Sequence, residues 1–419
     1  MTVHYSAVKT SGKILNLYKD PDSWFWLSGS VNPYRGCEHN CKYCDGKAEW
    51  YRVDHFSSQI KVKEDAHLKF SKELLALGFT TEEQPTLDSY IQMTLKKSAE
   101  DKTPKSIFAI GGGVCDVYQP AEAKYKITRK LLQVAKNFHL PISILTKSDL
   151  VIRDIDIIKS INKQMYANVA FSITLIDDKM REIFEPNSSS TSDRFLALRK
   201  IRSENIHGGV MFMPIIPGIG NSEENMKSII SESKKMGAEF ILPSGMTLKP
   251  GKNKQEMFAT IKTYFPSLMP LYTDFYGNNN KYGIPDYSSG KYLNPIRFVH
   301  EYCKKINLPD RIPRFISPNS IQANLFVSTI LFNIAYYYQY VENYPWRKIV
   351  NFFNAAKTIE LFKHSIQDFR RNDLKEKFTS DEVVLDSIEE LLQTRKSTIL
   401  SQYQNSEDTF VMTPKLLDD

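Results

Sequence analysis

The sequence predicts an α/β fold, a partial (β/α)6 TIM-like barrel that is followed by a C-terminal all-helical extension. From Ser106 to Gly245, short apolar runs alternate with segments whose apolar residues recur at helical spacing. Strands that alternate with helices indicate a parallel sheet with right-handed connections. A further strand before a cysteine-rich loop at 32–45 brings the count to about six βα units. In such folds a ligand binds at the carboxyl ends of the strands.

Each element of this alternation follows from its residue pattern. Short apolar runs closed by glycine or other turn residues predict buried strands, and longer periodic segments predict helices. Strands are expected at 106–112, 141–147, 166–174, 207–218 and 238–245, and helices at 68–78, 87–100, Ala121–Asn137, 153–163, Ser192–Glu204 and Glu223–Met236, with a short helix from Cys44 to Arg52. Helices are also expected at 296–306, Ser320–Tyr338, Trp346–Arg371 and Ser380–Gln404.

The length of 419 residues fits two or three domains. We expect an N-terminal arm at 1–30 that packs back on the core, the barrel at 31–276, a polar, Gly-containing linker at 277–290 and a helical domain at 291–419. The apolar segment 325–334 is too short to cross a bilayer, which favours a buried helix and no membrane partner.

Charge and cysteine content narrow the class of protein. The net charge of +7 permits contact with nucleic acid, although an evenly solvated surface explains the same excess. Five cysteines, three of them clustered, do not form a disulfide framework and fit a reducing compartment, so we expect a cytoplasmic protein. The first residues contain no continuous apolar segment of the kind found in secretory signals.

The cysteine loop, residues 32–45, reads NPYRGCEHNCKYCD and places Cys37, Cys41 and Cys44 in C-x3-C-x2-C spacing. Thiolates select zinc or iron–sulfur clusters. A cubane cluster normally takes four cysteines, yet Cys115 and the others lie far along the chain, so we expect a 4Fe–4S cluster with one open iron. The alternatives are a Cys3His zinc site with His39, which the spacing makes cramped, or unliganded thiols.

This spacing and its NPYRGC lead-in resemble the radical S-adenosylmethionine superfamily, in particular the branch that contains spore photoproduct lyase and DNA repair photolyase-like relatives. The resemblance implies that the open iron binds the amino and carboxylate groups of S-adenosylmethionine. It also implies that the reduced cluster cleaves this cofactor to a 5′-deoxyadenosyl radical, which abstracts hydrogen from a substrate. An electron donor such as ferredoxin or flavodoxin would then be a partner.

The resemblance also assigns cofactor contacts at the ends of the first two predicted barrel strands after the cysteine loop. Gly111, Gly112 and Gly113 match a glycine-rich edge that meets the methionyl amino group, and backbone without side chains can approach a ligand closely. Lys147 matches a lysine that binds the methionyl carboxylate. The alternatives are an ordinary tight turn at the glycines and a lysine that only faces solvent.

Further cofactor contacts are implied at three places. Ser172 matches a serine that hydrogen-bonds the cofactor, Tyr43 lies near the adenine, and the backbone of Met213–Gly218 packs against it. Ser172 is equally explained as a buried serine that bonds the backbone. The downstream Glu185, in a Phe-Glu-Pro sequence, has no assigned role and is explained as a cap of the following segment.

The substrate side departs from the family pattern. The position of a hydrogen-returning cysteine in spore photoproduct lyase falls on Gly113, but Cys115 follows two residues later and faces the same side of an extended segment. Cys115 is therefore a candidate hydrogen-atom donor, with a small buried thiol as the alternative. Asp45 stands where relatives have a tyrosine that takes part in hydrogen return. Asp116 and Tyr118 are expected to line the substrate entrance.

The sequence therefore predicts a radical S-adenosylmethionine enzyme with an unidentified substrate, and the two departures argue against the lyase activity itself. The substrate is expected to be nucleic acid, a peptide or a small molecule. Nucleic acid is a candidate because the branch contains a DNA-repair member and the C-terminal helices carry Arg347, Lys348, Arg370 and Arg371. The alternative is a non-catalytic, zinc- or cluster-containing nucleic-acid-binding protein.

Overall fold

The computed structural model describes residues 2–81, 107–278, 280–285, 294–317, 320–404 and 410–412. The helix expected at 87–100 lies outside this part of the chain. The chain divides into two compact units. The described residues of the first unit are 2–16, 29–81, 108–278, 280–285 and 294–295, and those of the second are 17–28, 107, 296–317, 320–404 and 410–412.

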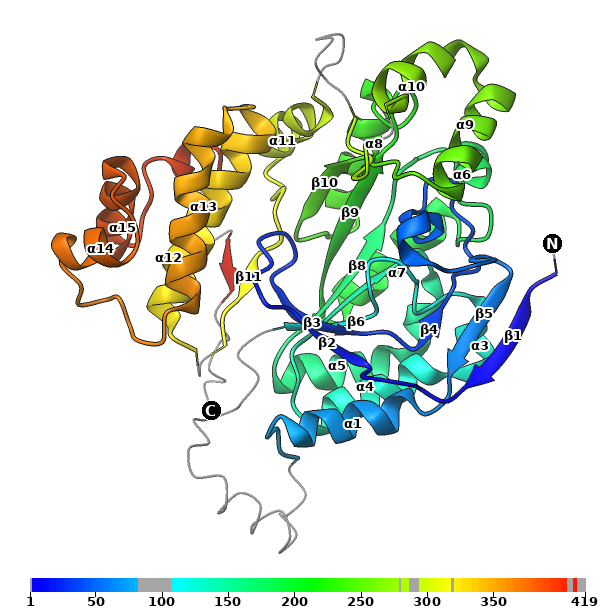
Figure 1. The fold of residues 1–419 in the computed structure, drawn as a ribbon, viewed down its shortest axis with the longest axis horizontal. Coiled ribbons are helices and arrows are strands. Elements are labelled where there is room, and N and C mark those ends of the chain that lie inside the picture. The colour runs from blue at the N-terminus through cyan, green and yellow to red at the C-terminus, as the bar shows by residue number, and fades with distance from the viewer. Residues whose placement is uncertain are drawn as a thin grey trace, which may run out of the picture. The chain divides into compact units, whose positions relative to one another are not determined.

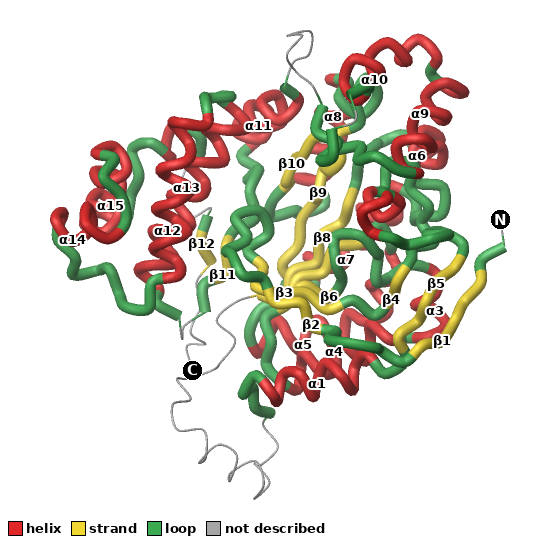
Figure 2. Tube along the Cα trace, viewed as in Figure 1, coloured by secondary structure: helices red, strands yellow, loops and turns green. Residues whose placement is uncertain are grey.

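A seven-stranded sheet contains all the predicted strands in the order β10-β9-β8-β7-β6-β3-β2. The pairs from β6 to β10 are parallel, and Figures 1 and 2 show where these strands lie. The predicted α/β fold with a parallel sheet and helical connections is thereby confirmed. The strands are β2 (Leu15–Leu17), β3 (Leu27–Val31), β6 (Ile107–Ile110), β7 (Ile142–Thr146), β8 (Ala167–Ser172), β9 (His207–Ile215) and β10 (Ile241–Gly245).

The middle of the sheet is covered on both faces, which explains its continuous apolar sequence. Every residue of β8 is buried, as expected for a central parallel strand. The neighbouring β9 carries Gly209, where a Cβ atom would lie 2.5 Å from the backbone oxygen of Phe240. Glycine at this position therefore lets the segment that leads into β10 approach β9 closely.

Helices follow the strands of the first unit, and α5 and α7 pack on β8. One predicted helix, Ala121–Asn137, is instead two, because Lys126 has a left-handed backbone with φ of 53°. The short helix expected from Cys44 to Arg52 is two 3-10 turns, Asp45–Lys47 and Glu49–Tyr51. The helices are α1 (Ala66–Ala76), α3 (Pro120–Tyr125), α4 (Ile127–Asn137), α5 (Ile155–Gln164), α6 (Asp178–Phe184), α7 (Thr191–Ser203), α8 (Glu223–Lys235), α9 (Lys252–Tyr264) and α10 (Met269–Tyr276).

A three-stranded sheet that the sequence analysis missed flanks the cysteine loop. Its order is β1-β5-β4, with β1 (His4–Val8) parallel and β4 (Tyr34–Arg35) antiparallel to β5 (Gln59–Lys63). The strand β4 leads directly into Cys37. The chain that the sequence assigned to one N-terminal arm is thus divided, because β1 pairs within the first unit and residues 17–28 belong to the second.

The second unit is mostly helical, as expected for the C-terminal extension (Figure 2). The helix predicted at Trp346–Arg371 ends at Leu361, and a separate helix begins at Arg371. Among the described residues, no helix is long and apolar enough to cross a membrane. The elements are α11 (Pro295–Ile306), β11 (Arg314–Phe315), α12 (Gln322–Tyr336), α13 (Trp346–Leu361), α14 (Arg371–Lys377), α15 (Glu382–Thr394) and β12 (Val411–Met412).

Residues 17–28 are anchored in the second unit by aromatic and guanidinium contacts. The Trp26 indole donates a hydrogen bond of 2.8 Å to the backbone oxygen of Ile312. The Arg311 guanidinium lies 5.4 Å from the Trp26 ring centre and 4.2 Å from that of Tyr336. These contacts are stacked and buried, so they fix the loop between β2 and β3 in the second unit.

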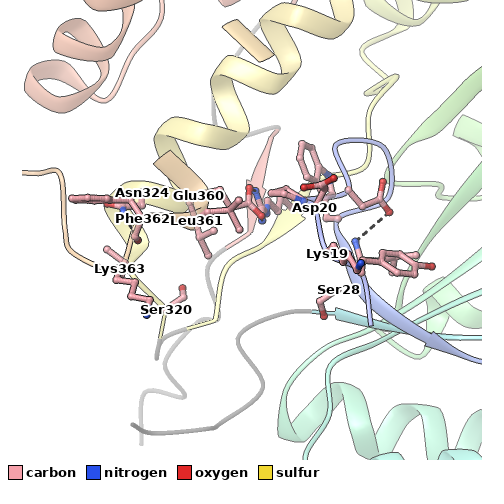
Figure 3. Close-up of a pocket in the computed structure, with 17 residues that line it drawn as sticks. Lys19, Asp20, Ser28, Ser320, Asn324, Glu360, Leu361, Phe362 and Lys363 are labelled. Carbon is pink, nitrogen blue, oxygen red and sulfur yellow. Dashed lines mark hydrogen bonds and ion pairs between the residues drawn. The ribbon is translucent and has the colours of Figure 1, made fainter. Parts of the chain in front are cut away.

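The second unit also holds a cavity of about 570 Å³ (Figure 3). On its wall, the Arg314 guanidinium makes a two-pronged contact with the Glu360 carboxylate, at 2.7 and 2.6 Å. The Asn324 amide is occupied by backbone oxygens at the end of α13. These polar groups of the wall therefore bond to one another or to the backbone.

Candidate functional site

A cavity of about 300 Å³ lies at the carboxyl ends of β6 to β10, and we call it the strand-end cavity. Parallel α/β sheets bind ligands at this edge. The cysteine loop closes one side. The residues that line the cavity are Cys37, His39, Cys41, Tyr43, Cys44, Asp45, Gly112, Gly113, Val114, Cys115, Asp116, Leu145, Thr146, Lys147, Ser172, Met213, Pro214, Ser244, Gly245, Met246 and Thr247.

The three cysteines of the loop all line this cavity. Cys37 and Cys41 are each 6% exposed, and Cys44 is half-buried. The loop turns at Gly36, which has φ of +91° and where a Cβ atom would lie 2.7 Å from the backbone oxygen of Phe56. The Cys37 amide bonds to that same oxygen at 2.9 Å. The backbone turn therefore directs Cys37 into the cavity.

The chemistry of these thiols fits a bound cluster. Burial raises the pKa of Cys37 and Cys44, and it raises that of Cys41 to about 12 although Lys147 acts in the opposite direction. A metal centre binds the thiolate, and its positive charge offsets the penalty of burying that anion. Each iron of a cubane takes one thiolate, so the sulfurs need to surround a cavity rather than meet at one point.

The part of the chain that the structure describes does not provide the ligands that a single metal ion would need. The described residues contain no group of three His, Cys, Asp or Glu side chains placed to hold one metal ion. The predicted fourth zinc ligand, His39, makes other contacts. Its Nδ1 lies 2.9 Å from the backbone oxygen of Asn187 and its Nε2 lies 3.1 Å from the Asp116 carboxylate.

The three glycines after β6 divide into two roles. Gly111 has φ of +118°, and its amide bonds to the backbone oxygen of Val31 at 2.7 Å, so it joins β6 to β3. Gly112 and Gly113 line the strand-end cavity. A Cβ atom at Gly113 would meet no atom within 4 Å, so the bare backbone there is open to a ligand.

A buried carboxylate, Glu185, connects the other predicted cofactor residues. It accepts hydrogen bonds from the Tyr43 hydroxyl and, at 2.9 Å, from the Thr174 hydroxyl. The Lys147 ammonium lies 3.8 Å from the same carboxylate and 5.9 Å from the Tyr43 ring centre. We call Tyr43, Lys147, Ser172, Thr174, Glu185 and Arg194 the Glu185 network.

Arg194, on α7, completes this network from the other side. Its guanidinium donates to Glu185 at 2.7 Å and to the backbone oxygen of Ser172 at 2.7 Å. Burial alone would raise the pKa of Glu185, but the charges of Arg194 and Lys147 and the Tyr43 hydroxyl lower it to about 2. Glu185 is therefore ionised at neutral pH. Sequence reasoning missed Arg194 and Thr174, because neither belongs to a recognisable motif.

On the predicted substrate side, Cys115 and Asp116 line the cavity and Tyr118 does not. Tyr118 is fully buried and donates to Asp154 at 3.2 Å. Burial and the neighbouring Cys44 raise the pKa of Cys115 to about 11. Asp116 accepts hydrogen bonds from the Thr146 hydroxyl at 2.8 Å and from the Lys147 amide at 2.7 Å.

An ion pair at the edge of the cavity joins segments that the sequence could not connect. The Asp45 carboxylate lies 2.5 Å from the Lys249 ammonium, which also faces the Tyr51 ring at 5.5 Å. The Thr247 hydroxyl is 3.5 Å from the same carboxylate oxygen. Asp45, which replaces the expected tyrosine, thus anchors the segment after β10.

Three thiols and a lysine around one cavity at the strand ends define an α/β protein with a site for a cofactor and a soft metal. Comparison with known proteins relates the chain to a family. The family model described as radical SAM superfamily matches residues 31–230. The predicted family is thereby confirmed for this segment. The superfamily uses a 4Fe–4S cluster and S-adenosylmethionine, the two cofactors expected from the sequence.

The chain is also similar to two uncharacterised proteins. It is 30% identical over 207 residues to protein MJ0683 of Methanocaldococcus jannaschii, across 49% of this chain and 65% of that one. It is 24% identical over 252 residues to protein Rv2578c of Mycobacterium tuberculosis, across 59% and 66%. The chain thus spans just under two thirds of the length of these relatives.

Among solved structures, the chain is similar to spore photoproduct lyase complexed with dinucleoside spore photoproduct. The TM-score is 0.48 with 14% identity, and the match covers 72% of this chain and 79% of that one. A second similar structure is SuiB of Streptococcus suis bound to S-adenosylmethionine, with a TM-score of 0.27 and 10% identity over 46% of this chain and 44% of that one.

Proposed function

We propose that this protein is a radical S-adenosylmethionine enzyme that abstracts hydrogen from a substrate yet to be identified. Cys37, Cys41 and Cys44 would bind a 4Fe–4S cluster and leave one iron open. The observation that carries this proposal is that the three cysteines, the Gly112–Gly113 edge and Lys147 line one cavity. We also propose that six strands, β3, β6, β7, β8, β9 and β10, form a partial (β/α)6 barrel around this cavity.

Different residues of the cavity would bind different parts of S-adenosylmethionine. Lys147 supplies a positive charge for the methionyl carboxylate, and Gly112 and Gly113 let the amino group approach the backbone. Tyr43 and the backbone from Met213 would lie against the adenine, and Ser172 would hydrogen-bond the cofactor. When bound and reduced, the cluster supplies the electron that cleaves this cofactor to a 5′-deoxyadenosyl radical.

Hydrogen return and electron supply complete the proposal. Cys115 faces the same cavity as the cluster cysteines, and burial keeps its thiol protonated, the form that donates a hydrogen atom. The cluster requires reduction by a low-potential partner such as ferredoxin or flavodoxin, in a reducing compartment such as the cytoplasm.

Anaerobic reconstitution with iron and sulfide tests this function. The protein should take up about four irons per chain, and with dithionite it should convert S-adenosylmethionine to 5′-deoxyadenosine. Cys41→Ala should lose both properties. Cleavage that persists in this variant, or wild-type protein that holds one zinc and forms no 5′-deoxyadenosine, would refute the proposal.

Nucleic acid is one candidate substrate class, because the branch that this chain resembles contains a DNA-repair member. Among the basic residues of the C-terminal helices, Arg371 forms ion pairs with Glu382, Asp386 and Glu389. Its positive charge is therefore already paired within the protein. Phosphate contacts would make binding strongly dependent on salt. Absence of DNA and RNA binding at low salt would remove this candidate.

A further inference from the structure

We infer that Glu185 is a positioning residue for the binding of S-adenosylmethionine. Its carboxylate fixes the positions of the Tyr43 side chain, the Lys147 side chain and the end of β8 relative to one another. This inference rests on the proposed function and assigns a role to a residue that contacts the cavity only through its neighbours. Glu185 is fully buried and is not among the residues that line the cavity.

The Glu185 network joins three separate parts of the cavity wall. Tyr43 belongs to the cysteine loop and precedes Cys44, whereas Lys147 follows β7. The third part is the end of β8, which Glu185 reaches through Arg194 and the backbone oxygen of Ser172. A single carboxylate therefore fixes the distances between elements that lie far apart in the sequence. Sites held in this way lose less freedom when the ligand binds.

The charges of the network favour an anionic ligand group. Glu185 carries one negative charge and lies between two cations, Arg194 at 2.7 Å and Lys147 at 3.8 Å. Arg194 is fully buried and takes the close contact, so it neutralises the carboxylate. One positive charge remains, and it belongs to Lys147, which faces the cavity. A carboxylate in the cavity would complete the charge balance.

A purely structural carboxylate would act differently. It would affect folding without affecting the affinity of a correctly folded protein for the ligand. The two roles are separated by measuring affinity for S-adenosylmethionine, iron content and melting temperature on the same preparations.

Glu185→Gln in the reconstituted protein is the first variant, and Glu182→Gln, in the helix α6 that ends just before Glu185, is its control. Glu182 is 65% exposed and contacts Arg181. Equilibrium dialysis with labelled S-adenosylmethionine should give a dissociation constant about ten- to a hundredfold above wild type for Glu185→Gln, a loss typical of positioning groups around a bound centre. The control should bind like wild type, and all three proteins should hold equal amounts of iron.

Glu185→Gln leaves a buried guanidinium unpaired, so two further variants keep the test decisive if it does not fold. The double variant Glu185→Gln with Arg194→Met removes the charge pair together. Tyr43→Phe removes only the hydroxyl that donates a hydrogen bond to Glu185. It should weaken the binding of S-adenosylmethionine about two- to tenfold while iron is retained.

The outcomes separate this inference from the proposed function. Wild-type affinity in Tyr43→Phe and in whichever Glu185 variant folds would overturn the inference and leave the proposed function intact. Loss of iron in these variants would also overturn it, since Glu185 would then act on the cluster. If the reconstituted wild type binds no S-adenosylmethionine, the proposed function fails and this inference fails with it.

Discussion

Cys115 lines the same cavity as the three cysteines of the loop and belongs to a buried cluster with Cys37 and Phe56, against which Cys44 packs. A fourth cysteine at this place is either a ligand that closes the cluster or a free thiol beside it. The C-x3-C-x2-C spacing favours the second role, because Cys115 lies outside that motif and far from it along the chain.

Cys115→Ala should therefore retain about four irons per chain and the formation of 5′-deoxyadenosine. Iron analysis and chromatography of the products measure both. Cys303→Ala, at a buried thiol in the second unit, is the control. If Cys115→Ala loses iron and the control does not, Cys115 is a cluster ligand and the open iron of our account is absent.

Two buried carboxylates, Glu185 and Asp116, make stability depend on pH. The folded protein lowers the pKa of Glu185 from 4.5 to about 2 and that of Asp116 from 3.8 to about 2. A depressed pKa stabilises the fold above the unfolded value, and the contribution is lost as the pH falls through the folded value.

These two groups should leave the stability of the metal-free protein unchanged between pH 7 and pH 5, and should lower it between about pH 4.5 and pH 2. Urea unfolding followed by circular dichroism measures the effect. The double variant Glu185→Gln with Arg194→Met should lose less stability over the acid range. An equal loss in both proteins would contradict the assignment of this pH dependence to Glu185.

At the scale of elements, the cysteine loop depends on its turn. Gly36→Ala places a Cβ atom 2.7 Å from the backbone oxygen of Phe56 and 2.9 Å from that of Gln59, at φ of +91°. Both are backbone atoms, so neither can turn away as the end of a flexible side chain could. We expect a loss of about 1–3 kcal/mol in unfolding free energy and weaker iron retention.

The matched control for this turn is Gly113→Ala, where the added Cβ atom meets nothing within 4 Å. Chemical denaturation of both variants should show destabilisation for Gly36→Ala alone. Equal stability of the two variants would show that the turn does not require glycine.

In the second unit, the side chain of Asn324 binds the backbone at the end of α13, although it lies far from that helix in the sequence. Its fully buried amide donates to the backbone oxygens of Ile359, Phe362 and His364 and accepts from the Ile366 amide. Asn324→Ala should cost about 1–3 kcal/mol, since it removes the side-chain bonds to the backbone of the buried residues Ile359 and Ile366. Asn351→Ala, which removes one half-buried bond to Asp381, should cost less. Equal melting temperatures would contradict this role.

At the scale of the whole molecule, local sequence patterns predicted the strands of the parallel sheet. Contacts between residues far apart in the sequence determined features that these patterns did not predict. The apolar runs that end at Gly111, Lys147 and Gly245 sufficed for β6, β7 and β10. The strand β1 was missed because it is exposed and has no apolar alternation. The end of α13 depends on Asn324, and the break after α3 depends on a left-handed Lys126 that no motif announces.

The candidate site divides in the same way. The cysteine loop, the glycines and Lys147 were found because each is a motif or follows a strand. The Asp45–Lys249 pair spans 204 residues, and the Tyr43–Glu185 bond spans 142. Such pairs leave no local pattern, so the sequence predicted residues that line the cavity, and the structure supplied the contacts that connect them.

The central claim is that three cysteines hold a cluster whose fourth iron is open to S-adenosylmethionine. Electron paramagnetic resonance of the dithionite-reduced protein tests it most directly. We predict the signal of a reduced 4Fe–4S cluster that changes when S-adenosylmethionine is added, because the cofactor binds the open iron. A cluster signal that the cofactor leaves unchanged, or the absence of any such signal after reconstitution, would contradict the claim.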